Sequence, residues 1–233
     1  MMRSANRGNA VFAGMLVVAG LLFAQRLTAA TRGPVSIPAP ARDELATNAK
    51  METAVFAGGC FWGIQSVFQH IKGVVSATSG YAGGTYDRPS YEDVSSGTTG
   101  HAESVRVVFD PSQITYGQLL RVFFSVAHDP TQLNRQGPDT GPQYRSALFY
   151  TSDEQKKTAE AYIDQLNKSH AFSKPIVTQV APLKEFYVAE AYHQNYAELH
   201  PDDLYIRIND APKVVNLKKE FPDLYSTKLA AHE

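Results

Sequence analysis

The sequence has little cysteine and no excess of either charge. Its 233 residues include one cysteine, Cys60, so no disulfide can form within the chain. Lysine and arginine total 22 against 23 aspartates and glutamates, and the formal net charge is −1. Nucleic-acid-binding proteins carry a basic surface, so this balance speaks against that class. Internal repeats and low-complexity tracts are absent, and the 43% hydrophobic content is typical of a soluble globular protein.

Long apolar runs are also missing, apart from one near the N-terminus. Residues 10–24 are uncharged and apolar, follow Arg3 and Arg7, and precede small residues at 28–30. This run is shorter than the roughly 20 residues that a membrane-spanning helix needs. A basic start, a compact apolar run and small residues are the features of a secretory signal. We expect export, to the periplasm if the source is bacterial; an uncleaved membrane anchor is the alternative.

Three regions follow from this division of the chain. Residues 1–30 are predicted to be the signal peptide. Residues 31–50 carry three prolines and no apolar periodicity, so we expect a linker. Residues 51–233 are predicted to form a single catalytic domain whose last part, from about residue 200, is a wrapping tail. We expect a monomer.

The pattern of apolar residues predicts the elements of this domain. Strands are expected at 54–57, 74–81, 105–109, 146–150 and 175–181, helices at 64–71, 115–127 and 152–169, and loops at 80–100 and 133–143. Their order indicates an α+β fold: a two-layer sandwich with a mixed sheet and a split-βαβ, ferredoxin-like plait core.

Cys60 lies between the first predicted strand and the first predicted helix, directly after two glycines. A thiol at a helix N-terminus faces the positive end of the helix dipole, which favours the reactive thiolate. The alternative is a buried, inert cysteine, since free cysteine is often buried. Phe61 and Trp62 follow immediately. They are either ordinary core residues or an aromatic wall that holds a small apolar group and keeps water out.

Six short motifs in this chain resemble the signature of the A-type peptide methionine sulfoxide reductases, in the family's order and over about residues 52–200. The motifs are Gly59-Cys60-Phe61-Trp62-Gly63, Gly80-Tyr81-Ala82-Gly83-Gly84, Gly97-Thr98-Thr99-Gly100-His101-Ala102-Glu103, His128-Asp129-Pro130, Gln143-Tyr144-Arg145-Ser146 and Tyr192-His193-Gln194-Asn195-Tyr196.

The resemblance implies a catalytic pair. Cys60 would attack the sulfoxide sulfur, and Glu103 would give a proton to the sulfoxide oxygen. A glutamic acid can do so only if its pKa is raised, as burial beside aromatic rings would raise it. Without the motif, Glu103 would be read as a solvated carboxylate at the end of a loop. The reaction would release methionine, leave Cys60 as a sulfenic acid, and accept the S epimer of free or peptide-bound sulfoxide.

The resemblance also implies a substrate pocket. Phe61 and Trp62 would hold the S-methyl group, and Tyr81 and Tyr144 would hydrogen-bond the sulfoxide oxygen. Asp139 would hold a water near the glutamate, although aspartate is also common in turns of this kind. No metal or organic cofactor is implied. The histidines at 101, 128 and 193 lack paired ligand spacing, so we expect structural roles for them.

This chain departs from many family members in having no second cysteine. Ser95 stands where some relatives have one. An external thiol, from glutathione with glutaredoxin or from a thioredoxin-like protein, is therefore expected to regenerate Cys60 through a mixed disulfide. Two other functions stay open from the sequence. One is a one-cysteine peroxidase, and the other is an exported binding module whose loop tyrosines grip glycan or peptide.

Overall fold

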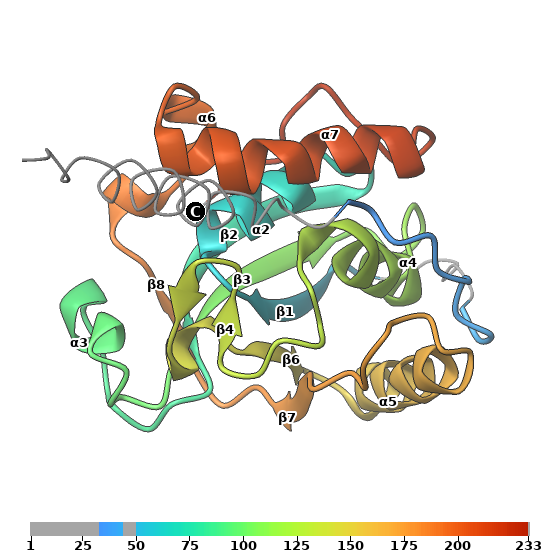
Figure 1. The fold of residues 1–233 in the computed structure, drawn as a ribbon, viewed down its shortest axis with the longest axis horizontal. Helices are drawn as coiled ribbons and strands as arrows, with labels where there is room; N and C mark the ends of the chain where they lie inside the picture. Colours follow the sequence, from blue (N-terminus) through green and yellow to red (C-terminus); the bar gives the residue numbers. More distant parts are fainter. Residues whose placement is uncertain (1–32, 44–49, 233) are drawn as a thin grey trace, which may run out of the picture. The chain divides into compact units, whose positions relative to one another are not determined.

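A six-stranded mixed sheet forms the centre of the computed structural model, in which residues 33–43 and 50–232 are described (Figure 1). Its strands, in spatial order, are β7 (Gln179–Pro182), β6 (Ser146–Tyr150), β1 (Glu52–Gly58), β3 (Ala102–Phe109), β2 (Val74–Ala82) and β8 (Phe186–Val188). Strands β6 and β7 pair in parallel, and the other neighbours are antiparallel. The α+β class and the mixed sheet are confirmed.

Helices and short segments connect these strands. The helices are α2 (Phe61–Gln69), α3 (Tyr91–Ser95), α4 (Tyr116–Val122), α5 (Asp153–Lys168), α6 (Tyr196–Leu199) and α7 (Ala211–Glu220). The shorter pieces are the π-helical turns η1 (Phe123–Ala127) and η4 (Ile206–Asp210), the 3₁₀ turns η2 (Pro142–Tyr144) and η3 (Ala191–His193), and the hairpin of β4 (Arg135–Gln136) and β5 (Asp139–Thr140).

The first half of the domain brings distant parts of the chain together. Strands β1 and β2 run in the same direction, are joined by α2, and have β3 between them as the antiparallel partner of both. That arrangement is a split β-α-β unit. It places the end of β1, the start of α2 and the start of β3 close together. Assignment of the whole core to the ferredoxin-like plait stays a prediction.

Strand β1 is buried on both faces because its alternate side chains enter two different clusters. Ala54 and Phe56 belong to the large cluster under the helices, where the Phe56 ring lies 4.5 Å from that of Phe68 in α2. Val55 and Ala57 face the smaller cluster on the opposite side. A strand buried on both faces fixes the position of its C-terminal end, where Cys60 follows.

Local capping explains where several helices begin. Thr115, at the start of the helix predicted for 115–127, accepts a hydrogen bond from the Gln118 N–H through its hydroxyl. The Gln118 side-chain oxygen in turn accepts one from the Thr115 N–H, which completes a capping box. One helix was not predicted: α3 lies within the expected loop at 80–100. It begins at Ser90, whose reciprocal bonds with Asp93 form the same box with aspartate in place of the usual glutamate or glutamine.

Residues 33–43, which fall within the predicted linker, are packed against the domain. Ser125 bonds the backbone of Val35 through both its carbonyl and its hydroxyl. The Tyr162 hydroxyl donates to the carbonyl of Pro38 at 2.6 Å. Ile37 is buried in the main cluster. These apolar and backbone contacts hold residues 33–43 against the domain, although the segment has no apolar periodicity.

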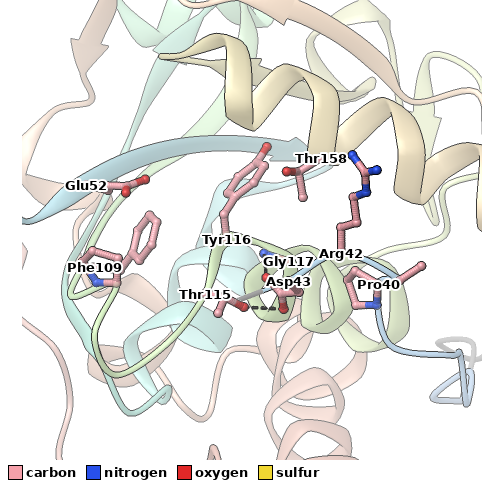
Figure 2. Close-up of a pocket in the computed structure, with 11 residues that line it drawn as sticks. Pro40, Arg42, Asp43, Glu52, Phe109, Thr115, Tyr116, Gly117 and Thr158 are labelled. Atoms are coloured by element: carbon pink, nitrogen blue, oxygen red, sulfur yellow. Dashed lines mark hydrogen bonds between the residues drawn. The ribbon is translucent and has the colours of Figure 1, made fainter. Parts of the chain in front are cut away.

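A cavity lies where this N-terminal segment reaches the start of α4. Figure 2 shows Asp43 beside Thr115, with Arg42 and Thr158 nearby. The Thr115 hydroxyl donates a hydrogen bond to the Asp43 carboxylate. None of the predicted catalytic or substrate-binding residues lines this cavity. The predicted signal peptide lies outside the described residues. Within the described part of the chain, no helix combines the length and the apolar character needed to cross a membrane.

The C-terminal part returns across the domain after β8. Helix α7 runs along α2 (Figure 1), with which it is in contact. Beyond α7, Tyr225 forms an isolated bridge with Ile71, and Ala231 forms one with Ser76 next to the sheet. The tail therefore wraps around the domain, and it contains a ten-residue helix that the sequence did not predict.

Candidate active site

Cys60 sits at the turn between β1 and α2 and is the N-cap residue of that helix. Gly59 before it has φ +101°, and a Cβ there would lie 2.5 Å from Gln136. A glycine is therefore required both for the backbone angle and for the close approach of the β4–β5 hairpin. Cys60 itself is buried, with 8% of its surface exposed.

Glu103 reaches Cys60 from the neighbouring part of the sheet. It is the second residue of β3, is 3% exposed, and accepts a hydrogen bond at 3.0 Å from the backbone N–H of Phe61. Phe61 is the residue directly after Cys60 and the first of α2. The split β-α-β unit thus brings the predicted pair together, although 43 positions separate them in the sequence.

The buried setting of Glu103 changes its protonation. Burial raises the pKa of this carboxyl to about 8, the nearby charges of Asp139 and Asp210 add to the rise, and the Phe61 N–H opposes it. The carboxylic acid is therefore the main form at neutral pH. A general acid must hold its proton before reaction, so this environment meets the requirement that the sequence imposed on Glu103.

The same burial corrects the expectation of a resting thiolate. The pKa of Cys60 is raised well above its ordinary value by loss of water, and negative charge on Glu103, once that carboxyl ionises, and on Asp210 adds to the rise. The Trp62 backbone N–H and the Lys213 ammonium lower it only in part. Cys60 is thus a thiol in the resting enzyme, because removal from water outweighs the position at the helix end.

Trp62, two residues after Cys60, belongs to a cluster of aromatic rings. Its ring stacks on Tyr196 with 3.8 Å between centroids, and Tyr205 meets it edge-on at 6.0 Å. Its indole N–H donates to Nδ1 of His193 at 3.2 Å, which fixes the ring. Phe61 is buried one step deeper, with its ring 5.9 Å from that of Tyr81. The arrangement suits a small apolar group beside a sulfur atom.

The two predicted tyrosines occupy different places. Tyr144 lies in η2, and burial together with the charges of Glu103, Asp139 and Cys60 raises its pKa, so its hydroxyl is within electrostatic reach of the pair. Tyr81 is fully buried, and its hydroxyl donates to Glu190 at 2.9 Å. The proton of the Tyr81 hydroxyl is therefore used in a hydrogen bond within the protein.

Tyr91, the first residue of α3, was missed by the sequence analysis. Burial raises its pKa, and interactions with Glu103, Cys60 and Asp139 raise it further, so its hydroxyl lies within electrostatic reach of the catalytic pair. Glu190 holds it in place by accepting a bond from the Tyr91 backbone N–H. The capping pair Ser90 and Asp93 was the sequence signal that could have indicated a helix beginning at Tyr91. Ser95, at the end of α3, is exposed and bonds the Tyr91 side chain.

Asp139 lies in the short strand β5, and its carboxylate accepts a hydrogen bond from the Tyr205 hydroxyl. Burial raises its pKa, and the bond from Tyr205 opposes the rise. The structure places Asp139 close enough to Glu103 to raise the pKa of that residue. Tyr205, which precedes η4 in the C-terminal part, was another residue that the sequence did not single out.

The predicted structural histidines have protein partners. His101 bonds the Gly84 N–H and the Tyr86 carbonyl. His128 bonds the Phe123 carbonyl and Ser146, and burial lowers its pKa to about 4. His193 accepts from Trp62. Among residues 33–43 and 50–232, no group of three or more histidine, cysteine or acidic side chains is arranged to hold a metal ion.

Other motif residues hold the site together. The Gln194 side chain accepts from Gln65 in α2 and from the Ser79 N–H in β2, and donates to the carbonyls of Ser79 and Ala189. Arg145 donates to the carbonyls of Gly100 and Pro142. These buried groups tie the C-terminal segment and the loops to the sheet that carries Glu103.

Comparison with known proteins agrees with this geometry. The family model described as peptide methionine sulfoxide reductase matches residues 52–224. The chain is 60% identical over 177 residues to peptide methionine sulfoxide reductase MsrA 2 of Mesorhizobium japonicum, covering 76% of this chain and 91% of the relative. It is 50% identical over 198 residues to the MsrA 2 of Synechocystis, covering 84% and 91%.

Solved structures give the same result. Reduced Mxr1 from Saccharomyces cerevisiae superimposes with a TM-score of 0.61 at 34% identity, covering 72% of this chain and 96% of that one. Methionine sulfoxide reductase A of Corynebacterium diphtheriae gives 0.57 at 35% identity, covering 74% and 87%. The range that the family model matches, residues 52–224, includes Cys60, Glu103 and the aromatic cluster around Trp62.

Proposed function

Because the chain belongs to the peptide methionine sulfoxide reductase family, we propose that Cys60 and Glu103 act together as its catalytic pair. The chain reduces methionine sulfoxide to methionine and so repairs oxidised proteins. It is an enzyme of the A type. The peroxidase and the binding module, left open by the sequence, lose their support.

One observation carries the assignment of the pair. The Glu103 carboxyl is bonded to the N–H of the residue that follows Cys60, and burial keeps this carboxyl protonated at neutral pH. An acid is thus bonded to the backbone one residue away from the sulfur nucleophile. Both are neutral at rest, which suits an uncharged sulfoxide entering a site with little water.

The proposed reaction balances without a cofactor. The Cys60 thiol and the sulfoxide give Cys60 sulfenic acid and methionine. A bond forms between the Cys60 sulfur and the substrate sulfur while Glu103 donates a proton to the sulfoxide oxygen. The thiol proton replaces the one that Glu103 has given. The protonated oxygen then passes as a hydroxyl group from the substrate sulfur to the Cys60 sulfur, so the substrate S–O bond and the S–S bond break as the S–OH bond of the sulfenic acid forms. Methionine leaves reduced by two electrons, and the sulfur of Cys60 is oxidised by two electrons.

The surrounding residues would orient the substrate. Trp62 and its stacked neighbour Tyr196 offer a flat apolar surface for the S-methyl group. We assign the hydrogen bonds to the sulfoxide oxygen to Tyr91 and Tyr144, whose hydroxyls lie within electrostatic reach of Glu103 and Cys60. The Tyr81 hydroxyl is occupied by Glu190, so a supporting role suits it better. Preference for the S epimer follows from the family.

The absence of a second cysteine sets the way in which Cys60 is regenerated. After reaction with one equivalent of methionine sulfoxide, addition of glutathione is expected to give a mixed disulfide at Cys60, and a second thiol is expected to release the free enzyme. A glutaredoxin or a thioredoxin-like protein would supply these thiols in the cell. Intact-mass measurement follows each step, since every change must occur at the single cysteine.

The contrary result would be a covalent dimer. If the oxidised enzyme is always reduced by way of a disulfide between two Cys60 residues, seen on a non-reducing gel before any glutathione adduct, the external-thiol route is wrong. Protein treated with iodoacetamide before the sulfoxide is added serves as the control. It should form neither species, because its only sulfur nucleophile is blocked.

We also propose that the enzyme is exported. The support is the basic start, the apolar run at 10–24 and the small residues that follow. An uncleaved anchor remains the alternative. In either case the catalytic unit would work where protein oxidation is frequent, and its reductant would have to be present in the same compartment.

A further inference from the structure

A buried pair of opposite charges lies where η4 joins α7. The Lys213 ammonium is 3.0 Å from a carboxylate oxygen of Asp210. The Asp210 side chain has no exposed surface, and that of Lys213 is 14% exposed. The second carboxylate oxygen of Asp210 is buried without a hydrogen-bond partner in the described structure. Burying such a pair costs free energy, so stability alone does not account for it.

This pair is pressed against the first turn of α2. A Cβ on Gly63 would lie 2.1 Å from the Asp210 carboxylate and 2.8 Å from the Lys213 ammonium. Gly63 is the third residue of α2, and Cys60 is the N-cap of that helix. The last glycine of the Gly59–Gly63 motif is thus needed so that the charged pair can approach the turn that carries the nucleophile. Figure 1 shows the packing of α7 along α2 that brings the pair there.

The two charges act on the Cys60 sulfur in opposite directions. The Asp210 carboxylate raises the pKa of Cys60, and the Lys213 ammonium lowers it. Lys213 also lowers the pKa of Asp139 and of His128, so its charge reaches the site from the side of α7. The described titratable groups that interact electrostatically with Cys60 are Glu103 from β3, Asp210, Lys213, Tyr91 from α3, Tyr144 from η2, and Tyr196 and Tyr205.

We propose that Lys213, held by Asp210 against Gly63, is a positioning residue that stabilises negative charge on the Cys60 sulfur as the thiol loses its proton to attack. This proposal rests on the assignment of Cys60 as the nucleophile. Lys213 gives up no atom in the reaction. Among the described groups that act on Cys60, Lys213 carries a positive charge, which partly offsets the Asp210 carboxylate that disfavours the thiolate.

The test measures the reactivity of Cys60 directly and needs no turnover. Iodoacetamide alkylates thiolate, and the single cysteine makes the reaction specific, so its rate against pH gives the titration of Cys60. We expect Lys213→Met and Lys213→Gln to shift this titration upward by about one pH unit, as loss of a nearby opposite charge does. Reductase kcat/KM should fall about tenfold at neutral pH.

Matched variants separate charge from structure. Lys213→Arg keeps the charge and should keep the titration of Cys60 within about 0.3 pH units of wild type. Lys219→Met, an exposed lysine of the same helix, should change nothing. Lys213→Gln can still bond Asp210, so it guards against a failure of the Met variant to fold.

Two results would overturn the proposal: titrations of the Gln and Met variants that coincide with wild type, or an Arg variant shifted as far as these two. Loss of the catalytic assignment itself would look different. Protein fully alkylated at Cys60 would then still reduce methionine sulfoxide.

Discussion

Cys60→Ser is expected to lower kcat for methionine sulfoxide by at least about 10⁴-fold. A serine hydroxyl has a far higher pKa than a thiol and attacks sulfur poorly, and an oxygen atom at this position cannot form a sulfenic acid. The chain has no second sulfur nucleophile of the cysteine type that could take over. Methionine release in the presence of excess dithiothreitol, measured with the S epimer, checks the prediction.

The fold should survive this change. Serine is close to cysteine in size, and Cys60 is bonded by no disulfide. Equal far-UV spectra and similar unfolding temperatures of the variant and wild type would show that loss of activity reflects lost chemistry. Ser173→Ala is the matched control, since Ser173 is exposed and lies in the loop between α5 and β7, outside the site. Turnover by the Cys60 variant within tenfold of wild type would remove Cys60 from the mechanism.

Glu103→Gln is expected to lower kcat by about 10²- to 10³-fold and to abolish one limb of the pH profile. In wild type the Glu103 pKa is raised to about 8, so the carboxylic acid predominates below that pH and is lost as the pH rises through it. Activity should therefore fall above about pH 8. A glutamine keeps the acceptor for the Phe61 N–H but has no acidic proton to donate.

The alkaline decline of the pH profile identifies the group that donates the proton. The residual activity of the Glu103 variant should show no decline centred near pH 8, whereas Glu154→Gln, a change at an exposed carboxyl of α5, should leave the wild-type profile intact. If the Glu103 variant retains both the rate and the alkaline decline of wild type, another group supplies the proton.

Local rules in the sequence predicted the parts of the site that local structure creates. The strand, glycine turn and helix around Cys60 lie where the apolar pattern indicated, and Gly59 adopts a backbone angle that glycine favours. Cap residues Thr115 and Ser152 begin the helices expected of them. The pairing of Cys60 with Glu103 needed the family motifs, because only the sheet brings β3 beside the start of α2.

Other parts depend on contacts between distant segments, which no short pattern records. The resting protonation of Cys60 depends on how much water the folded chain removes, so a rule based on the helix end alone gave the wrong state. Tyr205 and Lys213 come from the C-terminal region, whose helix α7 carries few buried residues and a weak apolar pattern. The short helix α3, which begins with Tyr91, lies in a segment whose glycine, serine and threonine content predicted a loop.

The most direct test of the account is the stoichiometry of the reaction without any reductant. Wild-type enzyme mixed with excess S-sulfoxide should release one methionine per chain and then stop, with one sulfenic acid at Cys60 that dimedone captures. Release of several methionines per chain, or of one with Cys60 still a free thiol, would contradict the claim that this sulfur takes up the oxidising equivalents of the substrate.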